Sequence, residues 1–531
     1  MSRKKEISYI NGRLSGKYLT EEVCRKLETL LKLDEEHGFV SDLKHTIYKL
    51  SESEVDRVIK EKSSDFIDFE SHKGTLENHQ TTGVAYMFFA KRLILGDSVG
   101  LGKTVEIAAL CNLLESNAMK EGKDFNFLYL TNKNVVAQGR REFITFTGNY
   151  VQEVYGEKAK VKKFLDENNV ELQSSVVGSH SLIKSVDFQE YIRTFIQDTG
   201  YNPFDILIID ESGDILTNST TQMYKEASHL ASLFDRVILL NATSFEKELR
   251  AFYNQLNFID KTFLPTKTEF QNTYEVYDYC GPYPTFSGKY KNAEQFRKLV
   301  GYRYLSRTRK GLGAVMEGCS ADIIEVPLSV EQKKLLTATS MPQMVYDCPS
   351  YFNMGVETTP STTPKLMALL RLLREDLRDA DSLLIFSRYK EAQYCIQEIL
   401  ESKGYYSEIM NGDTTQKERE VLINKFKLGE LPILITNVQK GLNFGNCNYC
   451  IFYDYDPNPS KMVQFEGRMT RSMNIINKHV YVLLSSGDEY RTFRNVIGNR
   501  ATASDIFAGS DFSCVMQLLL EKMNTSDKDK E

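Results

Sequence analysis

This sequence lacks tryptophan and has no cysteine pattern typical of a disulfide framework. The chain of 531 residues has no tryptophan and nine cysteines scattered along its length. Cysteines with this distribution are typical of reduced thiols and exclude a disulfide-rich secreted scaffold. The one CxxC pair, Cys447 and Cys450, has no second pair nearby, and residues 449–454 have the pattern of a buried strand. Core packing is therefore favoured over a metal site.

Long apolar segments are also missing. No stretch of about 18 apolar residues is present, so no membrane-spanning helix is expected. The basic start, MSRKK, is not followed by an apolar segment, so a secretory signal is not expected. We therefore expect a soluble intracellular protein, without distinguishing cytoplasm from nucleoid or nucleus.

The charge composition leaves a nucleic-acid partner open. The net charge of −6 does not favour a polyanionic partner, but binding depends on local basic tracks more than on the total. One such track is residues 285–312, where basic side chains are interleaved with Phe and Tyr and the single acid is Glu294. The track indicates either phosphate contact along a cleft or a solvated basic face around a hinge. The candidate contacts are Arg303, Arg307, Arg309 and Lys310.

Short apolar runs alternate with helical segments in two regions of the chain. In the first region the expected strands are Arg92–Leu95, Phe127–Leu130, Val176–Val177, Ile206–Ile209 and Val237–Leu240. In the second they are Leu383–Phe386, Ile433–Ile435, Cys450–Tyr453 and Val480–Leu484. This alternation predicts an α/β fold with two parallel sheets, each covered by helices on both faces.

The same pattern predicts five parts. They are a small N-terminal domain at 1–75, a first lobe at 76–260, insertions and an inter-lobe linker at 261–360, a second lobe at 361–500, and a C-terminal helix and tail at 501–531. A capping box at Ser51–Glu54 marks a helix start within the first part. No chemistry can be assigned to that part.

A phosphate-binding loop is predicted at residues 96–104, which read GDSVGLGKT between a strand and a helix. Gly100 and Gly102 allow backbone amides to surround phosphate oxygens at a helix N-terminus. Lys103 would reach the β and γ phosphates, and Thr104 would hold Mg²⁺. The strict pattern is not met, because Asp97 stands where its first glycine belongs.

Two further motifs complete the set that is expected of an ATPase. The segment FDILIIDE at 204–211 is an apolar strand that ends in two acids, in which Asp210 would hold Mg²⁺ and Glu211 would orient the attacking water. The segment QFEGRMTR at 464–471 places Arg468 and Arg471 three residues apart on one side of a helix start. In a two-lobed ATPase both would act as arginine fingers.

With these motifs the chain resembles the superfamily 2 helicases and, among them, the Swi/Snf family of chromatin-remodelling and DNA-repair translocases, over about residues 76–500. The resemblance implies two RecA-like lobes with helical insertions. It also implies that Gln80, in LENHQTTGVAYM, contacts adenine and that Gly441, in ITNVQKGLNF, belongs to the nucleotide site. The segment LYLTNKNVVAQGRREF resembles one that lies against DNA, and LLNATSFEKELRAFYNQLNFID resembles the coupling motif and the family's extension.

The chain departs from the family pattern at the coupling route. Ser212 and Gly213 follow the two acids, where the family has alanine and then histidine or a similar polar side chain. That polar side chain links the γ-phosphate to the coupling motif, and Gly213 has none. The coupling motif has Asn241 and Ser244 where threonine and proline are usual. The chain is therefore identified as a compact, diverged member.

The resemblance implies a DNA-dependent ATPase that uses ATP and Mg²⁺ to move along double-stranded DNA or to remodel complexes bound to it. It leaves open a protein partner that directs the motor, and it implies no membrane. One alternative is a strand-separating DNA or RNA helicase. Another is a nucleotide-binding scaffold without hydrolysis, which Gly213 favours and the intact Lys103, Glu211 and arginine pair oppose.

Overall fold

The computed structural model describes the greater part of residues 75–523, and the chain in it divides into two compact units after Leu312. We call the first unit lobe one and the second lobe two. The described residues are 75–168, 174–241, 249–262, 264–278, 284–300, 303–307, 316–317, 319–337, 345–346, 363–377, 382–438, 444, 447–456, 462, 465, 475–495, 497, 519 and 522–523. Residues 1–74 of the predicted N-terminal domain and most of the predicted C-terminal part lie outside them.

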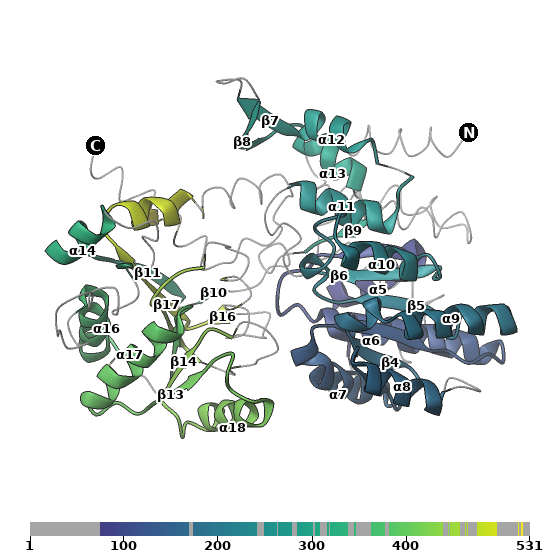
Figure 1. Cartoon of the computed structure of the whole chain (residues 1–531), viewed down its shortest axis with the longest axis horizontal. Helices are drawn as coiled ribbons and strands as arrows, with labels where there is room; N and C mark the ends of the chain where they lie inside the picture. Colours follow the sequence, from purple (N-terminus) through teal and green to yellow (C-terminus); the bar gives the residue numbers. More distant parts are fainter. Residues whose placement is uncertain are drawn as a thin grey trace. The chain divides into compact units, whose positions relative to one another are not determined.

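Lobe one is built on a seven-stranded sheet in the order β3-β4-β2-β5-β6-β1-β9, and every pairing in it is parallel (Figure 1). The strands are β1 (Arg92–Leu95), β2 (Phe127–Thr131), β3 (Gln152–Val154), β4 (Val176–Ser179), β5 (Ile206–Ile209), β6 (Arg236–Leu240) and β9 (Tyr304–Leu305). All five strands predicted for this region are confirmed, two of them with the same bounds.

Two helical layers cover the sheet of lobe one, because alternate strand residues point to opposite faces. Leu93 and Leu95 pack on one face with helices α5 (Asn78–Ala90), α6 (Lys103–Lys120) and α7 (Val136–Thr147). Ile94 packs on the other face. The helices there are α8 (Lys158–Glu167), α9 (Val186–Thr199), α10 (Gln222–Ala231) and α11 (Leu249–Ile259). The continuous apolar runs of the sequence therefore belong to strands buried on both faces.

A small appendage follows α11. It consists of α12 (Lys267–Tyr274), an antiparallel pair of strands, β7 (Glu275–Asp278) and β8 (Thr285–Tyr290), and α13 (Ala293–Val300). The hairpin extends away from the sheet of lobe one (Figure 1). Phe270 and Phe296 join the appendage to α11 through tilted ring contacts with Tyr253 and Phe252.

Lobe two has a six-stranded parallel sheet in the order β11-β17-β15-β12-β14-β13. Its strands are β11 (Ser320–Val326), β12 (Leu383–Phe386), β13 (Ser407–Met410), β14 (Ile433–Thr436), β15 (Tyr449–Phe452) and β17 (His479–Ser485). Helices α16 (Pro364–Glu375) and α17 (Lys390–Ser402) pack on one face, whereas Phe426 of α18 (Gln416–Lys427) packs on the other. Helix α14 (Val330–Leu336) and the short pair β10 (Met316–Glu317) and β16 (Ile475–Ile476) complete the described elements.

The four strands predicted for lobe two are confirmed, with small shifts at their ends. Strands β9 and β11 were not predicted, because both come from the segment 261–360 that was interpreted as insertions and linker. That segment therefore contributes a strand to each sheet. Cys447 and Cys450 are buried thiols that pack in the core of lobe two and form no disulfide with each other. Among the described residues, no helix is long and apolar enough to cross a membrane.

Candidate nucleotide-binding site

The predicted phosphate loop connects the end of β1 to the start of α6. Gly100 and Gly102 adopt φ values of 86° and 87°, which residues with a Cβ rarely reach. Gly102 is the N-cap of α6, so the free amides of the first helical turn point out of the loop, and the helix dipole adds positive potential there. Lys103 and Thr104 are the first two residues of this helix. The local geometry is that of an anion-binding helix start.

Side chains on two sides hold the loop in shape. The Lys103 ammonium donates to the carbonyl oxygens of Asp97 and, at 3.3 Å, Ser98. On the other side, the Gln80 amide donates to the carbonyl of Leu101 at 3.2 Å, and its oxygen accepts from the Glu77 amide at 3.0 Å. A Cβ on Gly102 would lie 2.3 Å from Gln80 Nε2, so the glycine is required for this contact. The predicted adenine contact of Gln80 stays a prediction.

The acidic pair follows β5. Asp210 Oδ2 accepts from the hydroxyls of Tyr129 at 2.8 Å and Thr131 at 3.2 Å, while its Oδ1 accepts from the backbone amide of Glu211 at 2.9 Å. Burial and the adjacent Asp210 carboxylate raise the pKa of the Tyr129 hydroxyl well above its ordinary value, so this hydroxyl remains a donor. Glu211 has a φ of 48°, a left-handed conformation that is uncommon without glycine and concentrates at functional sites.

The strand register brings the loop and the acids to one edge of the sheet. Leu95, the last residue of β1, is level with Leu240 of β6, and Ile209, the last residue of β5, is level with Leu239. Because all three strands are parallel, the phosphate loop and Asp210 leave the sheet at its carboxyl edge, where open α/β sheets bind ligands. The arrangement is suited to holding a phosphate chain at the loop and a divalent cation between Thr104 and Asp210.

A buried ion cluster lies beneath the loop. Arg307, which follows β9, donates through Nε to both carboxylate oxygens of Asp97 at 3.0 Å and through Nη2 to those of Glu106 at 2.9 and 2.8 Å. It also donates to the His79 carbonyl, and all three charged side chains are fully buried. Burial raises the pKa of Glu106 to about 8, despite the opposing effect of Arg307. The nearby Asp97 carboxylate, which shares the same cation, adds to the rise.

This cluster corrects the prediction that Arg307 contacts nucleic acid. Its side chain has no solvent-exposed surface and its charge is neutralised inside lobe one, so the guanidinium is not available to a phosphate. The Arg303 guanidinium also binds partners within lobe one, because it forms an ion pair with Asp260 at 2.9 Å and donates to the carbonyl of Ala90 at 3.4 Å. Arg309 and Lys310 lie outside the described residues.

In lobe two a buried carboxylate follows a strand of the sheet. Asp454, after β15, accepts from the Ser387 hydroxyl at 2.7 Å and from the Arg388 amide at 2.9 Å. Burial raises its pKa to about 6. Arg468, Arg471 and Gly441 lie outside the described residues, so their roles stay predictions.

The groups that support the site from a distance were not predicted from the sequence. Glu106 lies within helix α6, and Tyr129 and Thr131 lie within strand β2, and no role at the nucleotide site was predicted for any of them. Asp97 was noticed only as a departure from a pattern. A signal was nevertheless present, since Asp97 lies two residues after the buried strand β1 and a buried acid needs a partner.

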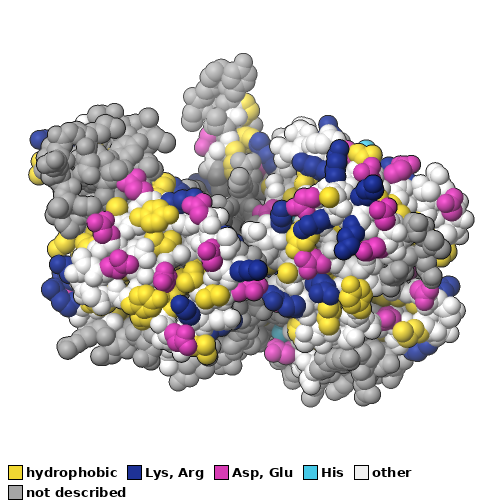
Figure 2. Space-filling model, turned by 60° about the horizontal axis from the view of Figure 1, so that its bottom comes forward, with side chains coloured by type: hydrophobic (Ala, Val, Ile, Leu, Met, Phe, Trp, Pro, Cys, Tyr) yellow, Lys and Arg dark blue, Asp and Glu magenta, His cyan; other side chains and the backbone are white. Residues whose placement is uncertain are grey.

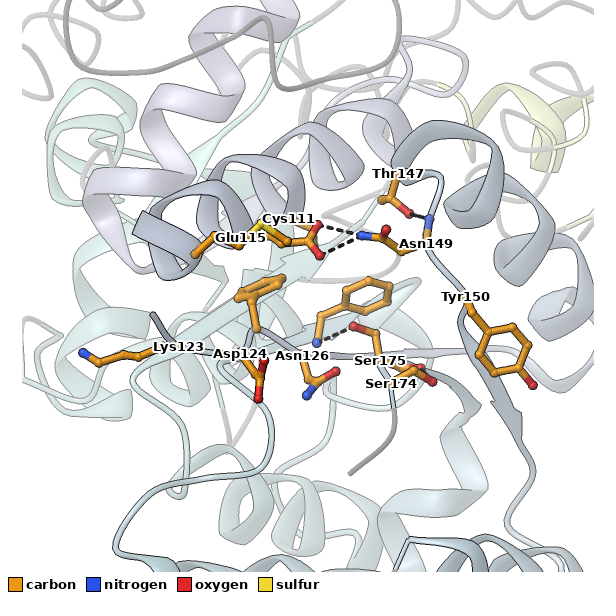
Figure 3. A pocket seen from close by; sticks show the side chains of 13 residues that line it. Cys111, Glu115, Lys123, Asp124, Asn126, Thr147, Asn149, Tyr150, Ser174 and Ser175 are labelled. Atoms are coloured by element: carbon orange, nitrogen blue, oxygen red, sulfur yellow. Dashed lines mark hydrogen bonds between the residues drawn. The ribbon is translucent and has the colours of Figure 1, made fainter. Parts of the chain in front are cut away.

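A separate pocket of about 530 Å³ lies at the opposite edge of the same sheet, beside the end of α6 and the start of β2. Figure 3 shows the Glu115 carboxylate facing the Asn149 amide, which donates to both of its oxygens at 2.8 and 2.7 Å. Burial raises the pKa of Glu115. This pocket shares no residue with the phosphate loop and is distinct from the nucleotide site.

Two family models match the chain. The SNF2-related domain matches residues 79–382, and the helicase conserved C-terminal domain matches residues 364–473. The first match begins at His79, next to Gln80, and ends at the start of β12. Together the two matches include both acids, the phosphate loop and the predicted arginine pair.

Several relatives share most of this chain at low identity. YwqA of Bacillus subtilis (strain 168) is 24% identical over 477 residues, which cover 82% of this chain and 49% of YwqA. The DNA repair and recombination protein RAD54B of Mus musculus is 21% identical over 495 residues, which cover 78% of this chain and 54% of that protein. The chain thus spans about half the length of these relatives. Among solved structures, the Sulfolobus solfataricus SWI2/SNF2 ATPase core in complex with dsDNA matches with a TM-score of 0.37 and 19% identity, covering 84% of this chain and 96% of that one.

Proposed function

The chain belongs to the family of the SNF2-related domain, and from that membership we propose that it is an ATP-driven translocase on double-stranded DNA. The observation that carries the proposal is the joint position of the phosphate loop and the Asp210–Glu211 pair at the carboxyl edge of one parallel sheet. Relatives named for DNA repair and recombination, and for chromodomain helicases that bind DNA, support a DNA substrate.

In this proposal lobe one holds the nucleotide. Lys103 would turn from the loop carbonyls to the β and γ phosphates, which present stronger acceptors. Thr104 and Asp210 would hold Mg²⁺, which neutralises charge on the phosphates when it is bound. Glu211 would orient the attacking water and accept its proton. Tyr129 and Thr131 hold Asp210, so its carboxylate keeps one orientation.

Arg468 and Arg471 would supply positive charge to the transferring phosphoryl group from lobe two. Because Lys103 and Arg471 belong to different lobes, such an arrangement would link hydrolysis to a change in lobe position. Gln80 would read the adenine, and Gly441 would lie in the same nucleotide site.

A series of lysines at the same edge of lobe one supports contact with a DNA backbone. They lie just after three adjacent strands: Lys133 in η3 (Lys133–Val135) after β2, Lys158 and Lys160 in α8 after β3, and Lys184 in η4 (His180–Lys184) after β4. All four are exposed, and Lys133 pairs with Glu157. Figure 2 shows several Lys and Arg side chains on one face of lobe one, with Asp and Glu side chains among them. We propose that these lysines, and not Arg303 or Arg307, contact DNA phosphates.

The deciding experiment compares ATP turnover with duplex DNA, single-stranded DNA, RNA and no nucleic acid. A duplex translocase predicts the highest turnover with duplex DNA, together with displacement of a third strand from a triplex. Unwinding of a forked duplex would favour the strand-separating alternative. A wild-type chain that binds ATP without turnover would favour the scaffold.

The lysine series has its own test. Reversal of Lys158, Lys160 and Lys184 to glutamate should weaken duplex binding for every sequence, because phosphate contacts carry no sequence information. It should also flatten the slope of log K against log salt by about 0.9 for each phosphate that is no longer neutralised. The matched control reverses Lys120 and Lys123, exposed lysines at the opposite edge of the sheet. Equal slopes for wild type and the triple variant would refute this DNA contact.

A further inference from the structure

Three buried polar side chains meet behind the acidic pair. Ser212, which follows Glu211, donates its hydroxyl to Gln255 Oε1 at 3.1 Å. Asn241, which follows β6, donates its amide to the same oxygen at 3.2 Å. The three side chains are at most 1% exposed. Polar groups at this depth are costly unless they are hydrogen-bonded, so the shared acceptor on α11 holds the other two in place. We call these residues the Gln255 bridge.

Gly213 and Asn241 fit each other sterically. A Cβ on Gly213 would lie 2.9 Å from Asn241 Nδ2 and 3.4 Å from its Oδ1. The Asn241 amide therefore occupies the space that a side chain at position 213 would enter. The two departures noted in the sequence, Gly213 and Asn241, are thus one local arrangement and not two independent losses.

The bridge connects the two halves of the nucleotide site. The backbone amide of Asn241 donates to the carbonyl of Leu95 at 3.0 Å, and Leu95 immediately precedes the phosphate loop. At the other end, Ser212 is joined to Glu211 by one peptide bond. Strand β6 lies between β1 and β5 in the sheet, so Asn241 is placed between the loop and the acids.

Helix α11 is attached to the acidic segment by further contacts. The Asn254 amide donates to the carbonyl of Thr217 at 2.6 Å, and the Tyr224 hydroxyl donates to the carbonyl of Asn254 at 2.9 Å. Gln255 therefore projects from a helix that is itself held against the segment after Glu211. A small movement of Asn241 or α11 would be passed to the left-handed backbone at Glu211.

We propose that Gln255 is a positioning residue that sets Glu211 relative to the phosphate loop, and that the Gln255 bridge replaces the connection that a polar side chain at position 213 would make. The inference rests on the proposed ATPase function. Gln255 acts through Ser212 and Asn241 and does not touch the nucleotide.

The test replaces Gln255 by methionine, which has a similar volume and no strong acceptor. ATP affinity should stay within about twofold, whereas turnover at saturating ATP should fall roughly 10- to 100-fold. The reason is that displacing the group that orients the attacking water slows the chemical step without weakening ATP binding. The matched control is Asn168→Leu, which removes a buried side-chain amide at the end of α8, bonded to Gln152 at the start of β3 and so at the opposite edge of the sheet. Its turnover should equal that of the wild type at the same loss of melting temperature.

A steric pair of variants tests the same bridge without removing Gln255. Gly213→Ala should lower turnover because its Cβ displaces the Asn241 amide from Gln255. Asn241→Ser, which removes that amide, should lower turnover by a similar factor, and the double variant should lose little more, because both changes break the same link. A purely structural role predicts instead that Gln255→Met and Asn168→Leu lower turnover equally, or that the losses of Gly213→Ala and Asn241→Ser add in the double variant. Either result would overturn the inference.

Failure of the proposed function is recognised separately. If duplex DNA does not stimulate the wild-type chain, the translocase proposal fails. The bridge is then still tested by turnover without DNA, which Gln255→Met should lower by the same factor.

Discussion

Replacing Arg307 by methionine should destabilise lobe one without altering contact with DNA. The change removes the guanidinium that faces the Asp97 and Glu106 carboxylates at hydrogen-bonding distance, and it keeps a similar apolar length. The basic, aromatic sequence around Arg307 suggested a phosphate contact, whereas its burial predicts a structural effect.

The size of the effect follows from the burial of the cluster. Removing one partner of a fully buried, hydrogen-bonded ion pair costs about 3–5 kcal/mol, because the remaining charge has no compensation. For a domain of this size each kcal/mol lowers the melting temperature by about 2–4 °C, so we expect a loss of roughly 6–20 °C. Arg303→Met is the matched control, because its pair with Asp260 is partly exposed and should be worth about 1 kcal/mol or less.

Thermal unfolding of both variants at neutral pH measures the difference, and the salt dependence of duplex binding is measured below both transitions. We expect a large loss of stability for Arg307→Met with an unchanged salt slope. Combining it with Asp97→Asn and Glu106→Gln should recover much of the stability, since no charge of the cluster is then left buried without a partner. A flattened salt slope with normal stability would refute the structural role and restore the DNA contact.

Three other predictions concern the nucleotide site. Lys103→Ala should abolish ATP hydrolysis with an unchanged melting temperature, and turnover retained in the folded variant would contradict the assignment of the loop. Arg471→Ala should lower DNA-stimulated turnover by roughly a thousandfold with ATP affinity nearly unchanged, while an equal loss of both would make it a binding contact. For Glu106, burial raises the pKa from 4.5 to about 8, so the stability that its protonated form contributes is lost as the pH rises through that range. The melting temperature of wild type relative to Glu106→Gln should therefore fall between pH 5 and pH 8, and parallel curves would contradict the shift.

The strands show which elements of the fold can be predicted from sequence patterns. A strand buried on both faces needs a continuous apolar run, and all nine predicted runs are strands of the two sheets. Strand β9 has only two residues, and its flanking arginines obscured it. Strand β13 mixes polar and apolar residues, and its middle residues Glu408 and Ile409 are only partly buried. Short or mixed strands of this kind are identified by their neighbours in the sheet and not by their own residues.

The sequence by itself determined the features that depend on consecutive residues. A glycine loop before a helix start forms an anion site through its own backbone, and two acids after an apolar run reach the carboxyl edge of any parallel sheet. The tertiary structure alone decided which distant groups complete them. Arg307 meets Asp97 across 210 residues and lies in the core, although its neighbours in sequence suggested a DNA track. Likewise, only the packing of α11 brings Gln255 between Ser212 and Asn241. The physical reason is that burial and charge compensation are properties of the folded neighbourhood, which local sequence does not contain.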